Sequence, residues 1–277
     1  MTLNAGNVLK INVTSDPKDT ILEYIQKYLN KPAKVDKNSS KIPVNPLVIV
    51  TPNPEQIVLA TRDFHFAKLL NQADISLPDG IGVVLASKIL GKPRIQKRIQ
   101  GVEFMQDLTA MAARNGVTIG LIGGREGLAV ETLKCLQSTY PRLTGWAEQV
   151  PDIFIEKNEL QVKNYDEEMK ETYFANLAKR IQKEKIGILF VGLGAPKQEY
   201  FIEAINSRLL SLDVGILLMS VGGSFDLISG NIKRAPHLVR MIGFEWAWRL
   251  VQQPWRWKRQ LALLKFMWLV LKSKLHI

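Results

Sequence analysis

Cysteine is almost absent from this sequence of 277 residues, because Cys135 is the only one. A single thiol excludes an internal disulfide and any metal site built from several cysteines, and it suits a reducing compartment. Because Cys135 falls in a stretch with helical periodicity, we interpret it as a core residue. The three histidines are scattered and have no metal-ligand spacing. The sequence therefore predicts no metal site.

Long hydrophobic runs are also missing. No apolar stretch reaches the roughly 18 to 20 residues that span a bilayer. The first residues lack the basic and apolar regions of a secretory signal. The hydrophobic fraction of 46% and the charged fraction of 23% are those of an ordinary globular protein. We therefore expect a globular protein that stays in the cytoplasm.

Acidic residues are scarce near the end of the chain, where Glu245 is the only one after position 230. The same segment carries five lysines, five arginines and five of the six tryptophans, in a chain of net charge +11. Lys258, Lys265 and Lys272 are seven residues apart and form one stripe on an otherwise apolar helix. Tryptophans and cations on such a helix suit the headgroup layer of a membrane. The alternatives are a core helix docked on the domain and a nucleic-acid-binding tail.

The rest of the chain alternates between apolar, strand-like runs and segments with helical periodicity, often joined by glycines. We expect strands at residues 8–13, 46–50, 73–77, 117–122, 186–191 and 214–220. We expect helices at residues 19–29, 81–90, 102–115, 131–140, 243–253 and 257–274. Residues 151–185 are interpreted as a solvated helix and linker. This order predicts an α/β fold, with a parallel sheet covered by helices on both faces.

One carboxylate stands between an expected strand and an expected helix, in the motif Leu77-Pro-Asp-Gly80. Open α/β sheets hold their ligands at the carboxyl ends of the strands, so Asp79 could be a general base. It could equally cap the following helix. Thr51 and Asn53 end another expected strand, and the same two alternatives apply to them.

Glycines follow three further expected strands, in the motifs Gly123-Gly124, Gly192-Leu-Gly194 and Gly222-Gly223. Paired glycines between a strand and a helix let the backbone approach a phosphate group. They also make ordinary turns, and the full dinucleotide fingerprint is missing. Taken alone, they are weak indicators of a nucleotide site.

Taken together, these motifs resemble those of the WecG/TagA/CpsF family of glycosyltransferases, in the family's order and over residues 8–259. The motifs that carry the resemblance are TPNPE at 51–55, LPDG at 77–80, RIQG at 98–101, GLGAPKQE at 192–199, GGSFD at 222–226, KRAP at 233–236 and EWAWR at 245–249. The resemblance implies a Rossmann-like catalytic domain over residues 1–243 and a basic, apolar helical appendage over residues 244–277.

The implied reaction is an inverting transfer of an N-acetylhexosamine, of the N-acetylmannosamine type, in cell-surface polysaccharide synthesis. The donor would be a UDP-sugar and the acceptor a polyprenyl-diphosphate-linked sugar. The resemblance implies no metal and no other cofactor, and the sequence has no Asp-x-Asp pair that would hold a metal against a nucleotide diphosphate. Cations and backbone amides would meet the charge of the departing UDP.

The resemblance also implies roles for single residues. Asp79 would take the proton of the acceptor hydroxyl, with an ordinary pKa, and Arg98 would counter phosphate charge. The residues expected to orient sugar and phosphate oxygens are Thr51, Asn53 and Gln198. Those expected near UDP are Gly123, Gly124, Gly194, Lys197, Gly222, Gly223 and Asp226, the last toward uridine. The arginines expected to grip the lipid diphosphate are Arg249, Arg256 and Arg259.

Two features depart from the family pattern. A Gly-Tyr-Phe sequence is replaced by Gly145-Trp-Ala-Glu-Gln149 and a charged insertion, which leaves the donor sugar open. The helix beyond position 260 is unusually apolar, which predicts firmer membrane attachment.

Two other functions are less consistent with these residues. A nucleic-acid-binding protein would use the basic, tryptophan-rich tail, but this leaves the Asp79 motif unexplained. A nucleotide-sugar epimerase or dehydrogenase would need a complete dinucleotide fingerprint. We therefore expect a glycosyltransferase that binds no nucleic acid, lies peripherally on the inner face of the cell membrane and could form a homo-oligomer.

Overall fold

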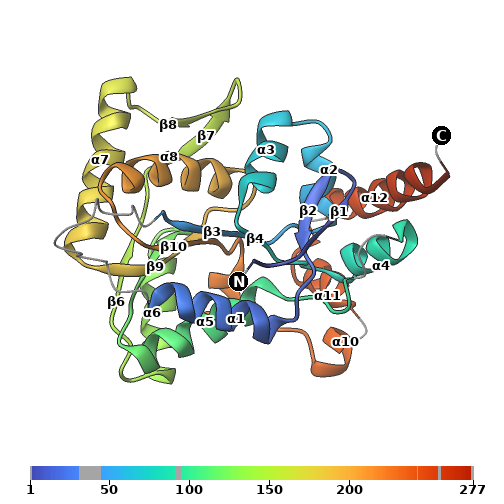
Figure 1. The fold of residues 1–277 in the computed structure, drawn as a ribbon, viewed down its shortest axis with the longest axis horizontal. Coiled ribbons are helices and arrows are strands. Elements are labelled where there is room, and N and C mark those ends of the chain that lie inside the picture. Colours follow the sequence, from blue (N-terminus) through green and yellow to red (C-terminus); the bar gives the residue numbers. More distant parts are fainter. Residues whose placement is uncertain (1, 31–44, 92–94, 242, 255–256, 276–277) are drawn as a thin grey trace.

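The centre of the fold is a six-stranded parallel sheet (Figure 1). The computed structural model describes residues 2–30, 45–91, 95–241, 243–254 and 257–275. In spatial order the strands are β4 Ile75–Ser76, β3 Leu47–Val50, β10 Leu217–Ser220, β9 Ile186–Gly192, β5 Thr118–Gly123 and β6 Gly145–Glu148. The central strands are nearly continuous apolar runs because helices cover both of their faces. The predicted α/β class is confirmed.

Two groups of helices cover the sheet, and each buries its own hydrophobic cluster. One face carries α3 Phe64–Gln72, α7 Glu167–Lys183 and α8 Lys197–Ser211. The other face carries α1 Lys18–Leu29, α5 Gly101–Asn115, α6 Leu128–Thr139 and α9 Ser224–Ile228. The remaining helices group to one side of the sheet and are α2 Pro54–Ala60, α4 Ile81–Leu90, α10 His237–Met241, α11 Glu245–Gln252 and α12 Trp257–Leu275.

The expected strand at residues 8–13 is instead a two-stranded antiparallel hairpin, separate from the main sheet. Its strands are β1 Ala5–Val8 and β2 Ile11–Thr14. The turn residues Leu9 and Lys10 have φ values of 50° and 70°. The Asn7 side chain accepts a 2.8 Å hydrogen bond from the Lys10 amide and so supports this turn. The prediction was wrong because neither turn residue is one that favours left-handed backbone.

A second hairpin lies where a helix and linker were expected. Strands β7 Ile153–Glu156 and β8 Glu159–Val162 pair antiparallel, and only α7 matches the helical part of the prediction. Lys157 and Asn158 form the turn with φ values of 49° and 63°. The charged residues of this segment obscured the alternation of apolar positions that would have indicated strands.

Helix α12 is docked through one face only. It lies against α2 and α4, and Phe266 and Val270 are buried in the same cluster as residues of those helices. A Cβ at Gly82 of α4 would lie 3.7 Å from the Phe266 ring. The apolar residues that stay exposed on the other face are Trp257, Leu261, Leu264, Trp268, Leu271 and Leu275.

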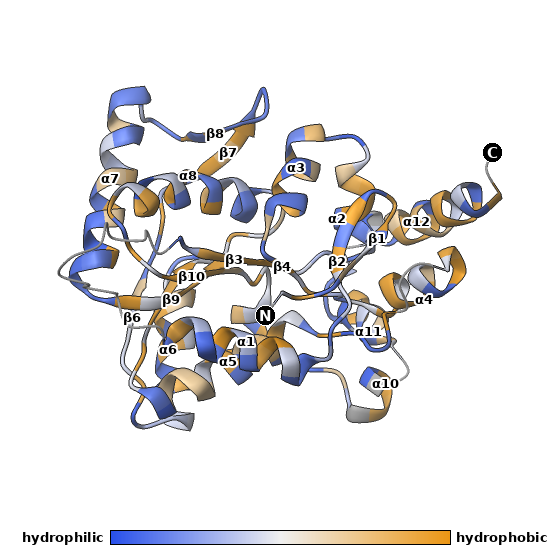
Figure 2. Cartoon of the chain, in the orientation of Figure 1, coloured by the Kyte–Doolittle hydropathy of each residue, from blue (hydrophilic) through white to orange (hydrophobic). Residues whose placement is uncertain are grey.

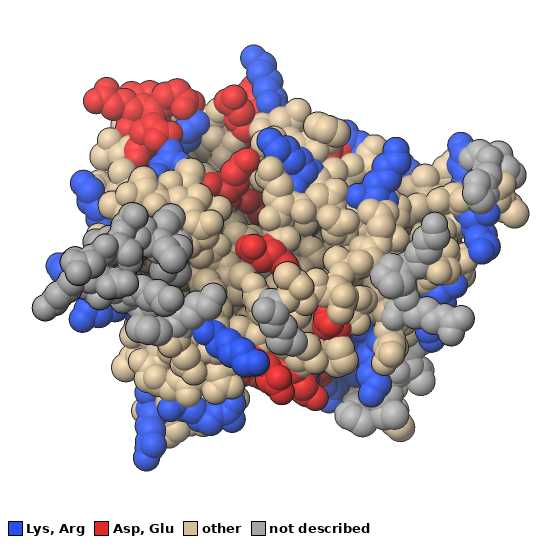
Figure 3. All heavy atoms as spheres, viewed as in Figure 1, with Lys and Arg blue, Asp and Glu red and all other residues tan. Residues whose placement is uncertain are grey.

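The surroundings of this exposed face are apolar and basic. Figure 2 shows hydrophobic residues along both α4 and α12. In Figure 3 acidic side chains gather near α7, whereas the end of the molecule formed by α12 shows Lys and Arg. Among the described residues, no helix is both long and apolar enough to cross a membrane.

Replacing the buried ring of α12 tests how this helix is held. Phe266→Ala should weaken docking by about 3 to 5 kcal/mol, because it removes a fully buried aromatic side chain. Hydrogen exchange measured by mass spectrometry should then speed up in α12 while β5 and β9 keep their protection. Leu264→Ala, on the exposed face of the same helix, is the control and should change neither. Unchanged exchange of α12 in Phe266→Ala would contradict this packing.

Candidate active site

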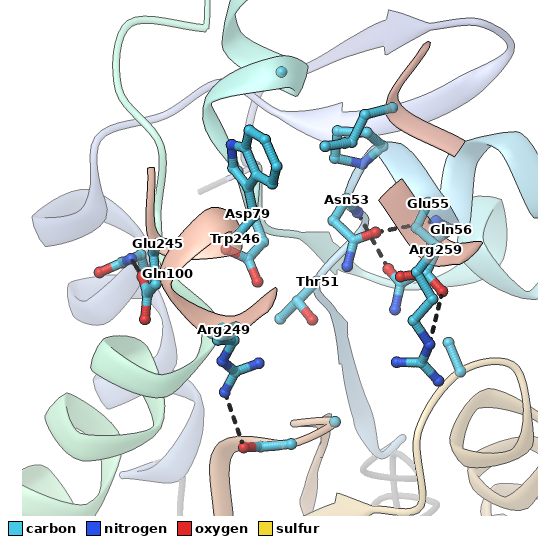
Figure 4. A pocket seen from close by; sticks show the side chains of 18 of the residues that line it. Thr51, Asn53, Glu55, Gln56, Asp79, Gln100, Glu245, Trp246, Arg249 and Arg259 are labelled. Carbon is cyan, nitrogen blue, oxygen red and sulfur yellow. Dashed lines mark hydrogen bonds and ion pairs between the residues drawn. The ribbon is translucent and has the colours of Figure 1, made fainter. Parts of the chain in front are cut away.

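A cavity of about 440 Å³ lies where the carboxyl ends of β3, β4, β9 and β10 meet the C-terminal helices. Parallel strands bring their carboxyl ends to one edge of the sheet, so loops distant in sequence converge there. Five segments contribute to its lining, and they lie within residues 51–56, 79–82, 98–102, 194–198 and 221–224. Helices α11 and α12 complete the wall with Glu245, Trp246, Arg249 and Arg259 (Figure 4).

Asp79 faces this cavity and does not cap α4. The N-cap of α4 is Gly80, whose φ of 99° suits glycine, and no side chain caps this helix end. The Asp79 amide donates a 3.2 Å hydrogen bond to the Pro52 carbonyl, which ties the loop after β4 to the loop after β3. The capping alternative is therefore wrong for Asp79, and its carboxylate is available to a ligand.

The surroundings of Asp79 change its acidity. Burial and, to a smaller extent, the nearby negative charge of Glu245 together raise its pKa from 3.8 to about 6. The charges of Arg249 and Arg98 and the Gly101 amide act in the opposite direction. The expectation of an ordinary pKa was wrong, because the sequence did not show how far the cavity shields this carboxylate from water. At neutral pH it is ionised and is a stronger base than an exposed carboxylate.

Thr51 and Asn53 lie beside Asp79 in different roles. Asn53 caps α2, since its side chain accepts a 3.0 Å hydrogen bond from the Gln56 amide and the Gln56 side chain bonds back to the Asn53 amide. The capping alternative therefore holds for Asn53, although it also lines the cavity. Thr51 is buried, and a Cβ at Gly101 would lie 3.3 Å from its methyl group. Glycine at that position lets α5 begin close to the Thr51 side chain.

Gln198 shapes the loop after β10. Its carboxamide oxygen accepts a 2.9 Å hydrogen bond from the Gly222 amide, and its nitrogen donates a 2.8 Å bond to Glu199. Both side chains are almost fully buried, and burial raises the pKa of Glu199 to about 7. The carboxamide thus holds the Gly222-Gly223 turn in place, and its expected contact with ligand oxygens stays a prediction.

Arginines surround the cavity, and each described one has a protein partner. Arg249 donates a 3.3 Å hydrogen bond to the Gly223 carbonyl, and Arg98 donates to the Arg240 carbonyl. Arg259 lies 3.4 Å from Glu55 in a half-exposed ion pair. Arg256 lies outside the described residues. Their positive charges face the cavity and make it suited to an anionic ligand.

Most of the predicted site residues meet here, and four do not. The residues around this cavity are Thr51, Asn53, Asp79, Arg98, Gly194, Gln198, Gly222, Gly223, Arg249 and Arg259. Gly124 and Lys197 line a second cavity of about 410 Å³, together with Phe154 and Lys163 at the β7–β8 hairpin. The Gly192–Lys197 loop contributes to both cavities, so they are neighbours. Gly123 and Asp226 line neither, although Asp226 approaches Gly223.

Two further residues at the cavity had no predicted role. Glu245 and Gln100 both line it, and the Gln100 side chain donates a hydrogen bond to the Glu245 carboxylate. Gln100 belongs to the RIQG motif and Glu245 to the EWAWR motif. In each motif only the arginine had an expected role. Among the described residues, no group of three His, Cys, Asp or Glu side chains could hold a metal ion.

Comparison with known proteins finds a matching family and similar proteins of known name. The sequence model of the glycosyl transferase WecG/TagA/CpsF family matches residues 7–277. The chain is 33% identical over 232 residues to the N-acetylglucosaminyldiphosphoundecaprenol N-acetyl-beta-D-mannosaminyltransferase of Bacillus subtilis (strain 168), which covers 82% of this chain and 80% of the relative.

Proteins of the same name from two other bacteria are similarly related. The one from Bacillus spizizenii is 32% identical over 228 residues, with 82% of this chain and 79% of the relative covered. The one from Staphylococcus aureus (strain MW2) is 33% identical over 233 residues, with 84% and 83% covered.

The raised pKa of Asp79 predicts that this residue costs stability at neutral pH. Between about pH 4 and pH 6 the folded protein binds a proton at Asp79 that the unfolded chain releases, so stability falls as the pH rises through this window. Asp79→Asn should therefore raise the free energy of unfolding by about 1 to 3 kcal/mol near pH 7.5, and the gain should vanish near pH 4. Urea denaturation of both proteins at the two pH values measures this. An equal gain at both would show that the carboxylate titrates normally.

Proposed function

Because the chain belongs to the WecG/TagA/CpsF family of glycosyl transferases, we propose that it moves N-acetylmannosamine from a UDP-sugar to a polyprenyl-diphosphate-linked N-acetylglucosamine. Its relatives identify it as a hexosyltransferase. Both the lipid-linked acceptor and the sugar are taken from the names of those relatives. The observation that carries the proposal is the Asp79 carboxylate, which faces a cavity bordered by Arg98 and Arg249.

The reaction is a single displacement in which Asp79 is the general base. The acceptor hydroxyl attacks the anomeric carbon as Asp79 takes its proton. A new carbon–oxygen bond forms on one face while the bond to UDP breaks on the other, and UDP leaves with the electron pair. The anomeric configuration is therefore inverted. A pKa of about 6 leaves Asp79 ionised at neutral pH and able to accept this proton.

The negative charge of the departing UDP requires a positive surface. Arg98 and Arg249 border the cavity, and the loops at Gly194 and Gly222-Gly223 bring backbone close to it. In this proposal these fixed groups stabilise the diphosphate without a metal ion. The nucleotide would extend across the Gly192–Lys197 loop toward the second cavity, where Lys197 lies.

The acceptor lipid would reach this cavity from the inner face of the cell membrane. The exposed face of α12 carries tryptophans and leucines, and Lys272 and Lys274 are exposed near its end, a composition that suits the headgroup layer. Arg259 lies on the same helix and borders the cavity, so the lipid diphosphate would meet positive charge near the bilayer surface. The protein would thus be a peripheral membrane enzyme.

Removing the base tests the reaction. Asp79→Asn should lower kcat by about 10² to 10⁴-fold, because the proposed general base would be gone. UDP released from UDP-N-acetylmannosamine with a short-chain polyprenyl-diphosphate N-acetylglucosamine acceptor measures transfer, and calorimetry should show near-normal UDP binding. Asp166→Asn is the control, since Asp166 caps α7 away from the cavity and asparagine caps equally well. Undiminished turnover in Asp79→Asn would refute this role.

Removing apolar side chains from α12 tests the membrane contact. Leu264→Ser with Trp268→Ser should weaken binding to anionic phospholipid vesicles at least about tenfold, because both side chains would enter the interface. Vesicle flotation measures the loss, and retention on DNA should stay negligible in all variants. Leu210→Ser changes an exposed leucine on α8 and should float like the parent protein. Equal flotation of both variants would contradict attachment through α12.

A further inference from the structure

Glu245 is a carboxylate on the wall of the Asp79 cavity that the displacement described above leaves without a part. It begins α11 and receives a hydrogen bond from the Gln100 side chain. Gln100 is itself buried and accepts a 3.3 Å hydrogen bond from Arg234. Glu245 is therefore held by the Gln100 side chain, which Arg234 in turn holds from the other side.

The same short segment also fixes Asp79. The Ile99 amide donates a 2.9 Å hydrogen bond to the Pro78 carbonyl, and the Gly101 amide bonds to the Asp79 carboxylate. Gln100 lies between these two residues and reaches Glu245. Figure 4 shows Glu245 against Gln100, beside Asp79 and Trp246. Residues 99–101 thus contact both α11 and the loop that carries Asp79.

The charges around Asp79 come from two elements. Helix α11 supplies Glu245 and, one turn later, Arg249, while the segment before α5 supplies Arg98. The two arginines stabilise the ionised carboxylate and so weaken the base, against the larger effect of burial. Glu245 offsets this effect. Helix α11 therefore supplies Arg249 for the diphosphate together with Glu245. The charge of Glu245 counteracts the effect of Arg249 on the pKa of Asp79.

We propose that Glu245 is a positioning residue that maintains the strength of the Asp79 base once α11 is docked. This role rests on the proposed function, because it matters only if Asp79 takes a proton. The pKa of Asp79 agrees with it, since Glu245 raises that pKa whereas Arg249 and Arg98 lower it. A protein in which α11 is undocked would have a weaker base as well as an incomplete cavity.

Glu245→Gln tests the charge while keeping an oxygen that can accept the Gln100 hydrogen bond. The acidic limb of the pH profile of kcat/KM should move about 0.5 to 1 unit lower, because a like charge near Asp79 is gone. On the plateau kcat should fall about two- to threefold, since the base is weaker. A role in packing alone would lower kcat without moving the limb.

Two further variants complete the test. Glu245→Asp keeps the charge, so its acidic limb should stay at the pH of the parent protein even if kcat falls. Glu167→Gln removes an exposed carboxylate on α7 and should match the parent protein in both measurements. The proposal is overturned if the limb of Glu245→Gln does not move, or if Glu245→Asp moves it equally. The Asp79→Asn assay tests the proposed function separately, because it measures the loss of turnover and not the pH dependence of kcat/KM.

Discussion

The site depends on one electrostatic balance, a carboxylate shielded from water between two arginines and a second carboxylate. Shielding alone makes Asp79 harder to ionise, and arginines alone would make it too easy to ionise. The parallel sheet makes the balance possible because it brings the ends of several strands to one edge. The remaining groups come from α11 and from the segment before α5, so the cavity is built by the sheet and the C-terminal helices together.

Much of the sheet could be predicted because its strands are buried on both faces and read as apolar runs. The strands at β3, β5 and β9 and the helix α4 lie where these patterns indicate. The two hairpins could not be predicted in the same way. Their turns use Leu9-Lys10 and Lys157-Asn158 in left-handed backbone, without the glycine that usually indicates such a turn.

The sequence was enough to select most of the residues that line the candidate cavity, but it did not reveal the properties of that cavity. Asp79 was chosen because it follows an expected strand, and the same reasoning left open whether Asn53 is a cap, which it is. The pKa of Asp79 depends first on its burial and then on Glu245. Glu245 is remote in sequence, and its motif indicates a helix but not what that helix faces. Long-range contacts of this kind arise from tertiary packing, so no local pattern indicates them.

Arg259 and Glu55 form an ion pair at the rim of the cavity. The two side chains are 3.4 Å apart and about half exposed. An ion pair in such a position contributes roughly 0 to 1 kcal/mol, so exchanging its partner costs little. A stronger anion at the rim of the cavity would therefore displace Glu55 from the guanidinium at little cost.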